Sequence, residues 1–229
     1  GDHYRGFWEE LTEVARRIAI LHKTLAEIPF AREIKEKPVL LLPWTTSGWE
    51  KIFKRAEIKK DNVDALLLDN KDLIENEIKK IMENNSRLER LEKQIIHADL
   101  HPQNTIFRNG KLAAFLDFEG ARKGELLRDV GNACHRFVRQ FVVFQKKDFK
   151  KILGRGIKIF LKEYGKINPI KKDKTNLIPL LISDELLRKL YKDINSHYFK
   201  SDSSKIEGGE LEKKINLLKE SEIIADYIK

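Results

Sequence analysis

The sequence predicts an α+β fold that is mainly helical, on three observations. Apolar residues recur at three- and four-residue steps through long segments of the 229-residue chain, which is the period of amphipathic helices. The short apolar runs that we assign to strands lie within residues 94–116, whereas the apolar run at residues 39–42 falls in a predicted irregular connection. With 41% apolar and 35% charged residues, the chain can bury a core. We therefore expect a small β-hairpin set among helices.

The N-terminal part is predicted to consist of helices joined by irregular chain. The apolar spacing predicts a helix over residues 7–28, which the following proline ends. Residues 30–46 form an irregular connection. Ser47 is a candidate N-cap, because Glu50 stands three residues on and completes the pattern of a capping box. A longer helix is predicted over residues 71–93.

Strands are predicted in the middle of the chain. Residues 94–96 and 104–107 read as strands, and residues 112–116 read as the return strand of a hairpin. The turn between the last two contains Asn109-Gly110, a pair that favours the positive φ angles of a type I′ turn. These strands would form one small sheet. The remainder is predicted to be helical over residues 126–146, 148–164, 178–200 and 209–228.

A polar motif follows the first of these strands. Residues 97–104 read His-Ala-Asp-Leu-His-Pro-Gln-Asn, and another aspartate, Asp117, comes at the end of the return strand. Phosphoryl transfer from ATP needs a carboxylate that accepts the proton of the attacking hydroxyl. It also needs an amide oxygen and a second carboxylate to hold Mg²⁺. The order matches a kinase catalytic loop followed by Asp-Phe-X, so we assign the base to Asp99 and the metal ligands to Asn104 and Asp117.

Other polar residues near the motif have supporting or open roles. We expect His97 and His101 to hold the loop by packing and hydrogen bonding, although His101 is also placed to touch phosphate or substrate. Glu119 either joins the metal shell, meets a substrate cation, or forms an ion pair with Arg122. Asp129 is expected to anchor the catalytic loop through backbone amides, the alternatives being a helix cap or an ion pair with the preceding arginine.

These residues resemble the aminoglycoside phosphotransferase and choline kinase family. The family pattern reads H-G-D-L-H-P-G-N, an apolar strand, D-[FW]-[GED], a short loop with glycine, and D-[LV]-[AG]. Residues 97–104, 117–119 and 129–131 follow it, and Leu21-His22 resembles the family's "LH" helix. The resemblance covers roughly residues 5–165. It implies a protein-kinase-like fold that uses ATP and Mg²⁺ to phosphorylate a hydroxyl of a small molecule.

The chain departs from the family pattern at two glycines. Ala98 and Gln103 stand in their places. We expect Ala98 to be a small change and Gln103 to be the position where the backbone loses glycine's freedom. Ala98 also argues against a regulated protein kinase, in which the equivalent residue is an arginine that pairs with a phosphorylated activation loop.

The resemblance further implies that an N-terminal lobe is missing. The sequence contains neither a glycine-rich phosphate loop nor a strand with a V-A-I-K-like lysine. Residues 1–229 would then be a single C-terminal lobe, with catalytic and metal loops at 95–131 and a helical substrate-side part at about 132–229. The chain is a fragment of a full kinase, a partner of a separately encoded N-terminal lobe, or a non-catalytic helical binding or scaffold module. We expect it to be inactive alone.

Composition limits the classes of partner that we expect for this chain. The formal net charge is +9, but the lysines are scattered and no arginine-rich arm accompanies them, so we expect no nucleic-acid partner. No segment approaches the roughly 18 to 20 apolar residues that span a bilayer, so we expect no membrane contact. The single cysteine, Cys134, suits a reducing cytoplasm and is expected to be buried. Four aromatic residues would form either core or a cation–π cage: Trp44, Trp49, Tyr191 and Tyr198.

Overall fold

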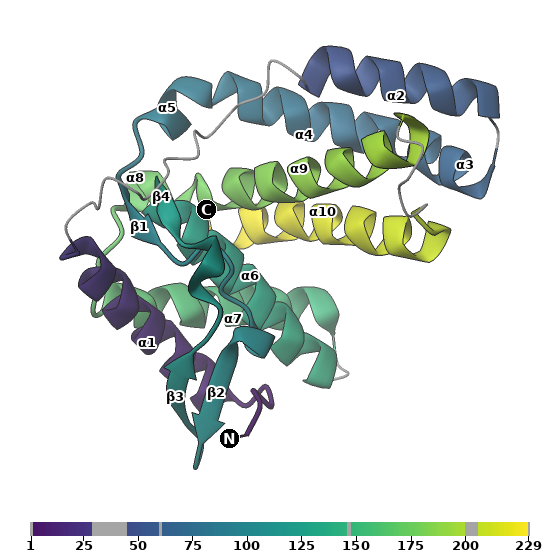
Figure 1. Cartoon of the computed structure of the whole chain (residues 1–229). Coiled ribbons are helices and arrows are strands. Elements are labelled where there is room, and N and C mark those ends of the chain that lie inside the picture. Colours follow the sequence, from purple (N-terminus) through teal and green to yellow (C-terminus); the bar gives the residue numbers. More distant parts are fainter. Residues whose placement is uncertain (1, 29–44, 60, 146–147, 200–205, 229) are drawn as a thin grey trace. The chain divides into compact units, whose positions relative to one another are not determined.

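The computed structural model describes residues 2–28, 45–59, 61–145, 148–199 and 206–228 (Figure 1). The fold is α+β and mainly helical, as predicted. The chain divides into two compact units. A core unit contains residues 1–39, 90–181 and 223–229, and a helical unit contains residues 40–89 and 182–222. Sequence alone groups residues 132–229 as the helical part, whereas contacts in three dimensions assemble the helical unit from two distant segments.

The core unit contains three long helices and four short strands. Two helices, α9 (Ile178–Phe199) and α10 (Gly208–Ile228), begin or end in it. Its other elements are α1 (Trp8–Ala26), β1 (Lys93–Ile96), β2 (Thr105–Arg108), β3 (Lys111–Phe115), β4 (Arg122–Glu125), α6 (Leu126–Gln145), α7 (Phe149–Gly165) and α8 (Lys172–Thr175).

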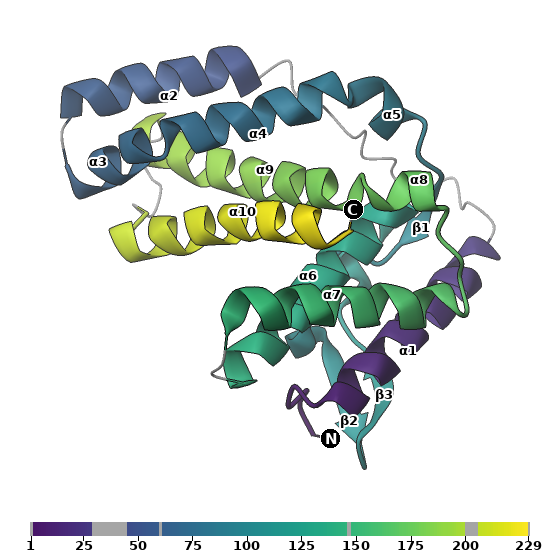
Figure 2. The same cartoon turned by 180° about the vertical axis from the view of Figure 1, so that it is seen from behind.

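Helix α1 confirms the N-terminal helix predicted from apolar spacing. Leu11, Val14 and Ile18 lie on its buried face, and the helix runs beside α7 (Figure 2). Arg16 of α1 donates to Glu163 of α7 at 2.6 and 2.8 Å. Hydrogen bonds from Lys166 and Arg16 hold the pKa of Glu163 below its usual value. Apolar burial and one ion pair thus fix α1 against α7.

The strands form two sheets rather than the single sheet that was predicted. β1 pairs with β4 and β2 pairs with β3, both antiparallel. The sequence did not predict β4, because residues 122–125 are too polar to look like a strand. Gly124 faces Ile96 so closely that an added Cβ would lie 2.7 Å from its Cδ1. The hairpin turn was predicted correctly, since both of its central residues have positive φ angles.

Two helix predictions were wrong in detail. Helix α2 (Thr45–Lys59) begins before Ser47, so Ser47 lies inside the helix and is not its N-cap. The helix predicted over residues 71–93 is interrupted, giving α4 (Lys71–Glu83) and α5 (Asn85–Glu89). Asn84 separates them, and its side-chain amide donates to the Lys80 carbonyl. Asparagine competes in this way with the helical backbone pattern, which explains the break.

Helix α3 (Asn62–Asp69) was not predicted. It begins at a capping box in which Asp61 accepts from the backbone of Asp64, and the Asp64 carboxylate accepts from the backbone of Asp61. The pattern uses aspartate where the usual capping box has glutamate or glutamine.

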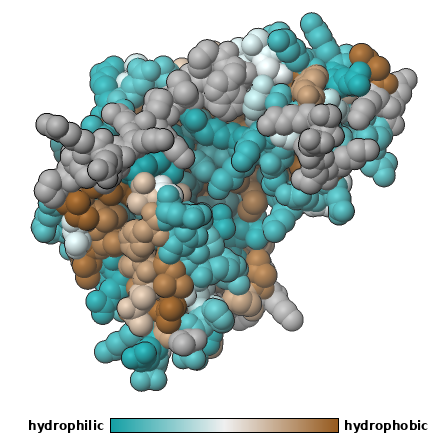
Figure 3. Space-filling view, viewed as in Figure 1, coloured by the Kyte–Doolittle hydropathy of each residue, from teal (hydrophilic) through white to brown (hydrophobic). Residues whose placement is uncertain are grey.

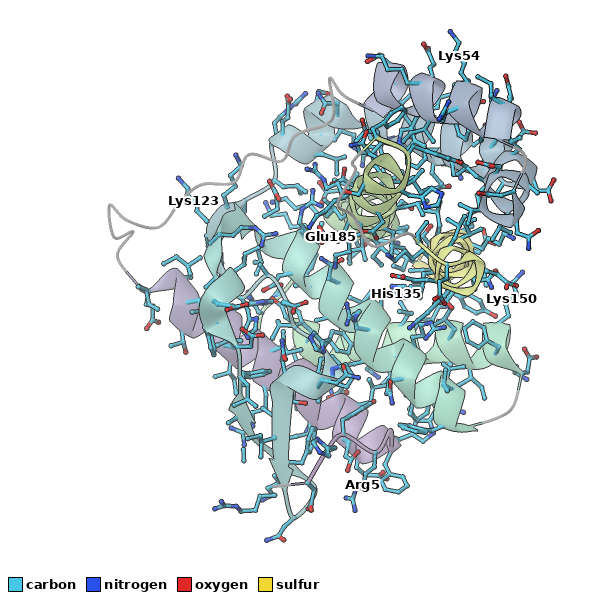
Figure 4. The ribbon with its side chains drawn as sticks, turned by 45° about the vertical axis from the view of Figure 1, so that its right-hand side comes forward. Arg5, Lys54, Lys123, His135, Lys150 and Glu185 are labelled. Carbon is cyan, nitrogen blue, oxygen red and sulfur yellow. The ribbon has the colours of Figure 1, made fainter. Side chains whose placement is uncertain are left out.

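In the helical unit, α2, α3 and α4 pack with most of α9, from residue 182 onward, and with the first part of α10. Ile52 and Phe53 of α2 are buried, while Lys54 points outward (Figure 4). A buried polar cluster joins three helices: Ser183 Oγ lies 2.7 Å from Glu77 Oε2 and 2.8 Å from Ser221 Oγ. Lys80 neutralises Glu77.

Three remaining expectations concern burial, membranes and the connection at residues 30–46. Cys134 is fully buried, and burial raises the pKa of its thiol. None of the helices in the described ranges combines the length and apolarity needed to cross a bilayer. The irregular connection lies almost wholly outside the described residues.

Candidate active site

His97 connects the loop at residues 97–104 to the segment around Asp117. It is fully buried. Its Nδ1 accepts from the Asp99 backbone N–H at 3.3 Å, which leaves the proton on Nε2 to donate to the Leu116 carbonyl at 2.9 Å. Its ring also packs on Phe118, with centroids 4.4 Å apart. Because Leu116 and Phe118 flank Asp117, His97 holds both motifs together.

Asp99 and Asn104 lie side by side within this loop. The Asn104 side-chain nitrogen donates to the Asp99 carbonyl at 3.0 Å and lies 3.4 Å from Asp99 Oδ2. The Asp99 side chain is 46% exposed, and His101 Nε2 lies 3.3 Å from its Oδ2. The described residues provide no donor to Asn104 Oδ1. The arrangement leaves an accessible carboxylate and, beside it, an amide oxygen that can accept a cation.

Asp117 lies at a sharp turn next to the loop. Its φ and ψ angles are +61° and +65°, in the left-handed region, and the residue is exposed. The preceding Leu116 donates its N–H to the Asn104 carbonyl at 2.9 Å. The end of β3 is therefore bonded directly to the residue that carries the candidate metal-binding amide.

Asp129 accepts two backbone hydrogen bonds from the start of the loop. Its Oδ2 accepts from the His97 N–H at 2.9 Å and its Oδ1 accepts from the Ala98 N–H at 3.1 Å. The Asp129 side chain is completely buried. The loop is thus attached to the first turn of α6, the contact that the sequence predicted for this residue.

A buried hydrogen-bond chain supports Asp129 from behind. His22 Nε2 lies 3.2 Å from Asp129 Oδ2, and His22 Nδ1 lies 2.8 Å from the Tyr164 hydroxyl. Burial raises the pKa of Tyr164 above its usual range, so its hydroxyl stays protonated and donates to His22. The sequence indicated His22 only through the "LH" resemblance. The signal that could have indicated its structural role was its position on the buried face of α1.

Ala98, rather than Gln103, adopts the conformation that favours glycine. The φ angle of Ala98 is +69°, whereas Gln103 lies in a 3₁₀ turn (Pro102–Asn104) and has no positive φ. The expectation that Gln103 strains the backbone was therefore wrong. A left-handed alanine costs roughly 1–2 kcal/mol relative to the right-handed region.

We expect Ala98→Gly to stabilise the fold by up to about 1 kcal/mol. Glycine relieves the strain of the left-handed conformation, and the extra backbone entropy that glycine loses on folding costs less than that strain. Gln103→Gly, the matched control in the same loop, should destabilise by up to about 1 kcal/mol. Chemical unfolding of both variants measures the difference. Equal effects of the two glycines would contradict the assignment of the strain to Ala98.

Glu119 is exposed and does not form the ion pair that was one alternative for it. Arg122 instead donates to the Gly120 carbonyl at 3.4 Å, and no contact between the Arg122 and Glu119 side chains is present although both are described. The alternatives that remain for Glu119 are the metal shell and a substrate cation.

The candidate metal ligands are hard oxygen atoms, as Mg²⁺ prefers. The described residues hold no cluster of three or more His, Cys, Asp or Glu side chains suited to a metal. A kinase site does not need one, since phosphate oxygens and water complete the shell around one carboxylate and one amide. Asp117 and Asn104 fit that requirement.

Comparison with known proteins decides the family. Residues 4–162 match the phosphotransferase enzyme family. The chain belongs to this family. It is 30% identical over 148 residues to a homoserine kinase of Afipia carboxidovorans, covering 63% of this chain and 40% of that protein. It is 26% identical over 180 residues to a homoserine kinase of Chelativorans sp., covering 77% and 48%. The chain thus spans about half the length of these curated relatives.

Solved structures share the fold. An aminoglycoside phosphotransferase from Alicyclobacillus acidocaldarius superposes with a TM-score of 0.68 at 16% identity, covering 97% of this chain and 65% of that one. Amicoumacin kinase hAmiN superposes with a TM-score of 0.60 at 18% identity, covering 96% and 59%. At these identities the likeness establishes the kinase-like fold alone.

Proposed function

We propose that this chain is the catalytic lobe of a small-molecule kinase, which transfers the γ-phosphate of ATP to a hydroxyl. The hydrogen bond between Asn104 and Asp99 carries this proposal, because it sets the candidate base next to a candidate metal ligand. Membership of the phosphotransferase enzyme family supports it. A binding or scaffold module would have no use for an exposed carboxylate held in this way.

In the proposed reaction, Asp99 accepts the proton of the attacking hydroxyl. Its exposed carboxylate is open to an acceptor, and its backbone is fixed by His97 and Asn104. Asn104 and Asp117 would hold Mg²⁺, which neutralises charge on the phosphates when ATP is bound. Most of the rate gain comes from this positioning and charge neutralisation.

The acceptor class is proposed from the curated relatives. They are homoserine kinases, so a small compound with both a hydroxyl and an amine is the first acceptor to test. Glu119, exposed two residues after Asp117, is then proposed to meet the amine rather than the metal. Glu119→Gln would raise KM for such an acceptor more than it lowers kcat.

A nucleotide-covering lobe is proposed to complete the site, in the same or a separate polypeptide. Exposed apolar side chains support this: Leu116 and Phe118, 40% and 42% exposed, flank Asp117, and Ile20 on α1 is 44% exposed. Figure 3 shows apolar side chains gathered over α1 and β3. Large exposed apolar surface usually marks a contact with another protein segment.

We expect these 229 residues alone to bind Mg-ATP weakly and to show almost no phosphoryl transfer. The reason is that the sequence contains neither a glycine-rich phosphate loop nor a V-A-I-K-like lysine, the groups that cover the nucleotide and contact its phosphates in kinases. Calorimetry with Mg-ATP tests this, and the protein that carries both lobes is the positive control. Tight binding by the present chain would show that the proposed second lobe is unnecessary.

A further inference from the structure

Three of the four aromatic residues for which a cation–π cage was an alternative have other partners. Trp49 is 2% exposed and packs edge-on against Tyr191, with ring centroids 5.5 Å apart. The hydroxyl of Tyr198 donates to Asp64, and Trp44 lies outside the described residues. Trp49 therefore belongs to the core, which was the other alternative.

Gln103 contacts the side chain of His101 within the catalytic loop. The side-chain amide of Gln103, at its Oε1 position, lies 2.7 Å from His101 Nδ1. The backbone N–H of Gln103 donates to the same nitrogen at 3.3 Å. In the family pattern this position is a glycine, which has no side chain for the first of these contacts. The chain thus holds the His101 ring with a residue that departs from the family pattern.

His101 in turn faces the candidate base. Its Nε2 lies 3.3 Å from Asp99 Oδ2, and its side chain is only 14% exposed. The backbone of His101 is also fixed, because this residue caps the 3₁₀ turn Pro102–Asn104 and its carbonyl accepts from the Asn104 N–H at 3.0 Å. The two nitrogens of the ring are therefore held at opposite ends, Nδ1 by Gln103 and Nε2 by Asp99.

These contacts decide which nitrogen of His101 carries a proton. A bare Nε2 would present its lone pair to the carboxylate of Asp99, so Nε2 carries a proton that points toward Oδ2. In the neutral ring, Nδ1 then accepts from the Gln103 backbone N–H and from the NH₂ group of its side chain. In the doubly protonated ring, the amide oxygen of Gln103 accepts from Nδ1 instead. The Gln103 amide serves both forms, and in both Nε2 directs its proton at Asp99.

The two carboxylate oxygens of Asp99 therefore differ in their surroundings. Oδ2 lies 3.3 Å from His101 Nε2 and 3.4 Å from Asn104 Nδ2. Oδ1 receives neither a hydrogen bond nor an ion pair from the residues that the structure describes, and the Asp99 side chain is 46% exposed. Because both neighbouring donors gather at Oδ2, Oδ1 is the oxygen that can accept a proton from a bound molecule.

We propose that Gln103 is a positioning residue that acts through His101, and that Oδ1 of Asp99 is the atom that accepts the proton. This inference rests on the proposed kinase function. In that reaction the O–H bond of the acceptor breaks and an Oδ1–H bond forms. The acceptor oxygen bonds to the γ-phosphorus of ATP, and the bond from that phosphorus to the leaving ADP breaks. Gln103 keeps His101 at Oδ2, so that Asp99 presents Oδ1 to the hydroxyl.

Nuclear magnetic resonance of the present chain tests the positioning without any measurement of activity. Gln103 is exposed, so Gln103→Met removes the amide while it keeps the length of the side chain and the fold. Three-bond couplings across χ1 of His101 should show one rotamer in the wild type and an average of rotamers in Gln103→Met. Gln140→Met makes the same chemical change near the far end of α6 and should leave the couplings unchanged. The same single rotamer in the wild type and in Gln103→Met would overturn the positioning role.

Kinetics of the protein that carries both lobes test whether Gln103 acts through His101. Gln103→Met should lower kcat about three- to tenfold, the value of one hydrogen bond. KM for ATP and for the acceptor should change by no more than about twofold, because the contact serves the transition state. His101→Ala should lower kcat by at least as much, and adding Gln103→Met to it should have no further effect. Effects that multiply in the double variant would show that Gln103 acts by another path.

Asp99→Asn separates a failure of this inference from a failure of the proposed function. Wild-type kcat in Asp99→Asn would overturn both, because no base would be left for Gln103 to position. A large loss in Asp99→Asn beside wild-type kcat in Gln103→Met would overturn only the role of Gln103. Gln140→Met is again the matched control, and we expect it to keep the kcat of the wild type.

Discussion

Asp99→Asn should lower kcat by roughly 10²- to 10⁴-fold, the usual contribution of a positioned base. The substitution keeps the shape of the side chain and the backbone hydrogen bonds of the loop, but it removes the proton acceptor. Affinity for ATP should change little, because Asp99 is assigned to the hydroxyl acceptor and not to the nucleotide. Steady-state kinetics on the protein that carries both lobes measures this.

Asp117→Asn provides the contrast. Loss of this carboxylate removes charge that neutralises Mg²⁺, so we expect weaker metal and nucleotide binding, partly restored at high Mg²⁺. A Mg²⁺ titration of both variants separates the two roles. If high Mg²⁺ restored Asp99→Asn and left Asp117→Asn inactive, the roles would have to be exchanged. If both variants kept wild-type kcat, the proposed function itself would fail.

Asp129→Ala should destabilise the core unit by about 3–5 kcal/mol, the cost of removing one partner from a buried charged network. The substitution removes the acceptor of the buried His97 N–H, of the half-buried Ala98 N–H and of a buried nitrogen of His22. Chemical unfolding of the chain measures the loss. A midpoint equal to that of the wild type would show that Asp129 does not hold the loop.

Asp129→Asn is the milder variant if the alanine form does not fold. It retains one acceptor oxygen, so we expect about half the loss of stability. Hydrogen exchange at the amides of His97 and Ala98 should accelerate, because one of their two acceptors is replaced by an NH₂ group. Glu119→Gln, exposed in the same region, should change stability by less than about 0.5 kcal/mol. Unchanged exchange at both amides would argue against anchoring by Asp129.

The candidate site was largely predictable because its parts are close in sequence. Asp99 and Asn104 are five residues apart, and the hairpin that separates them from Asp117 is set by Asn109-Gly110, whose φ angles are dictated by local sterics. Helix α1 was predictable for a similar reason, since its apolar period repeats along one face. Local geometry is enough to specify these features without any long-range contact.

Other features depend on partners far along the chain. Strand β4 is too polar to be recognised alone and exists because it pairs with β1. His22 is 107 residues from Asp129, so its role is visible only once α1 packs beside α6. The left-handed Ala98 is imposed on a residue that would avoid it, at a loop whose ends are fixed by Asp129 and His97.

The sequence by itself determined the helical period, the hairpin turn, and the order of the base and metal-ligand candidates, because each depends on neighbours within a few residues. Tertiary structure alone decided which segments form the helical unit, where backbone strain falls, and which buried side chains hold the loop. Those outcomes depend on contacts between residues far apart in the chain, such as His22 and Tyr164, which are 142 positions apart. Such contacts depend on which helices pack together, and the apolar period of a helix shows its buried face without showing the partner of that face.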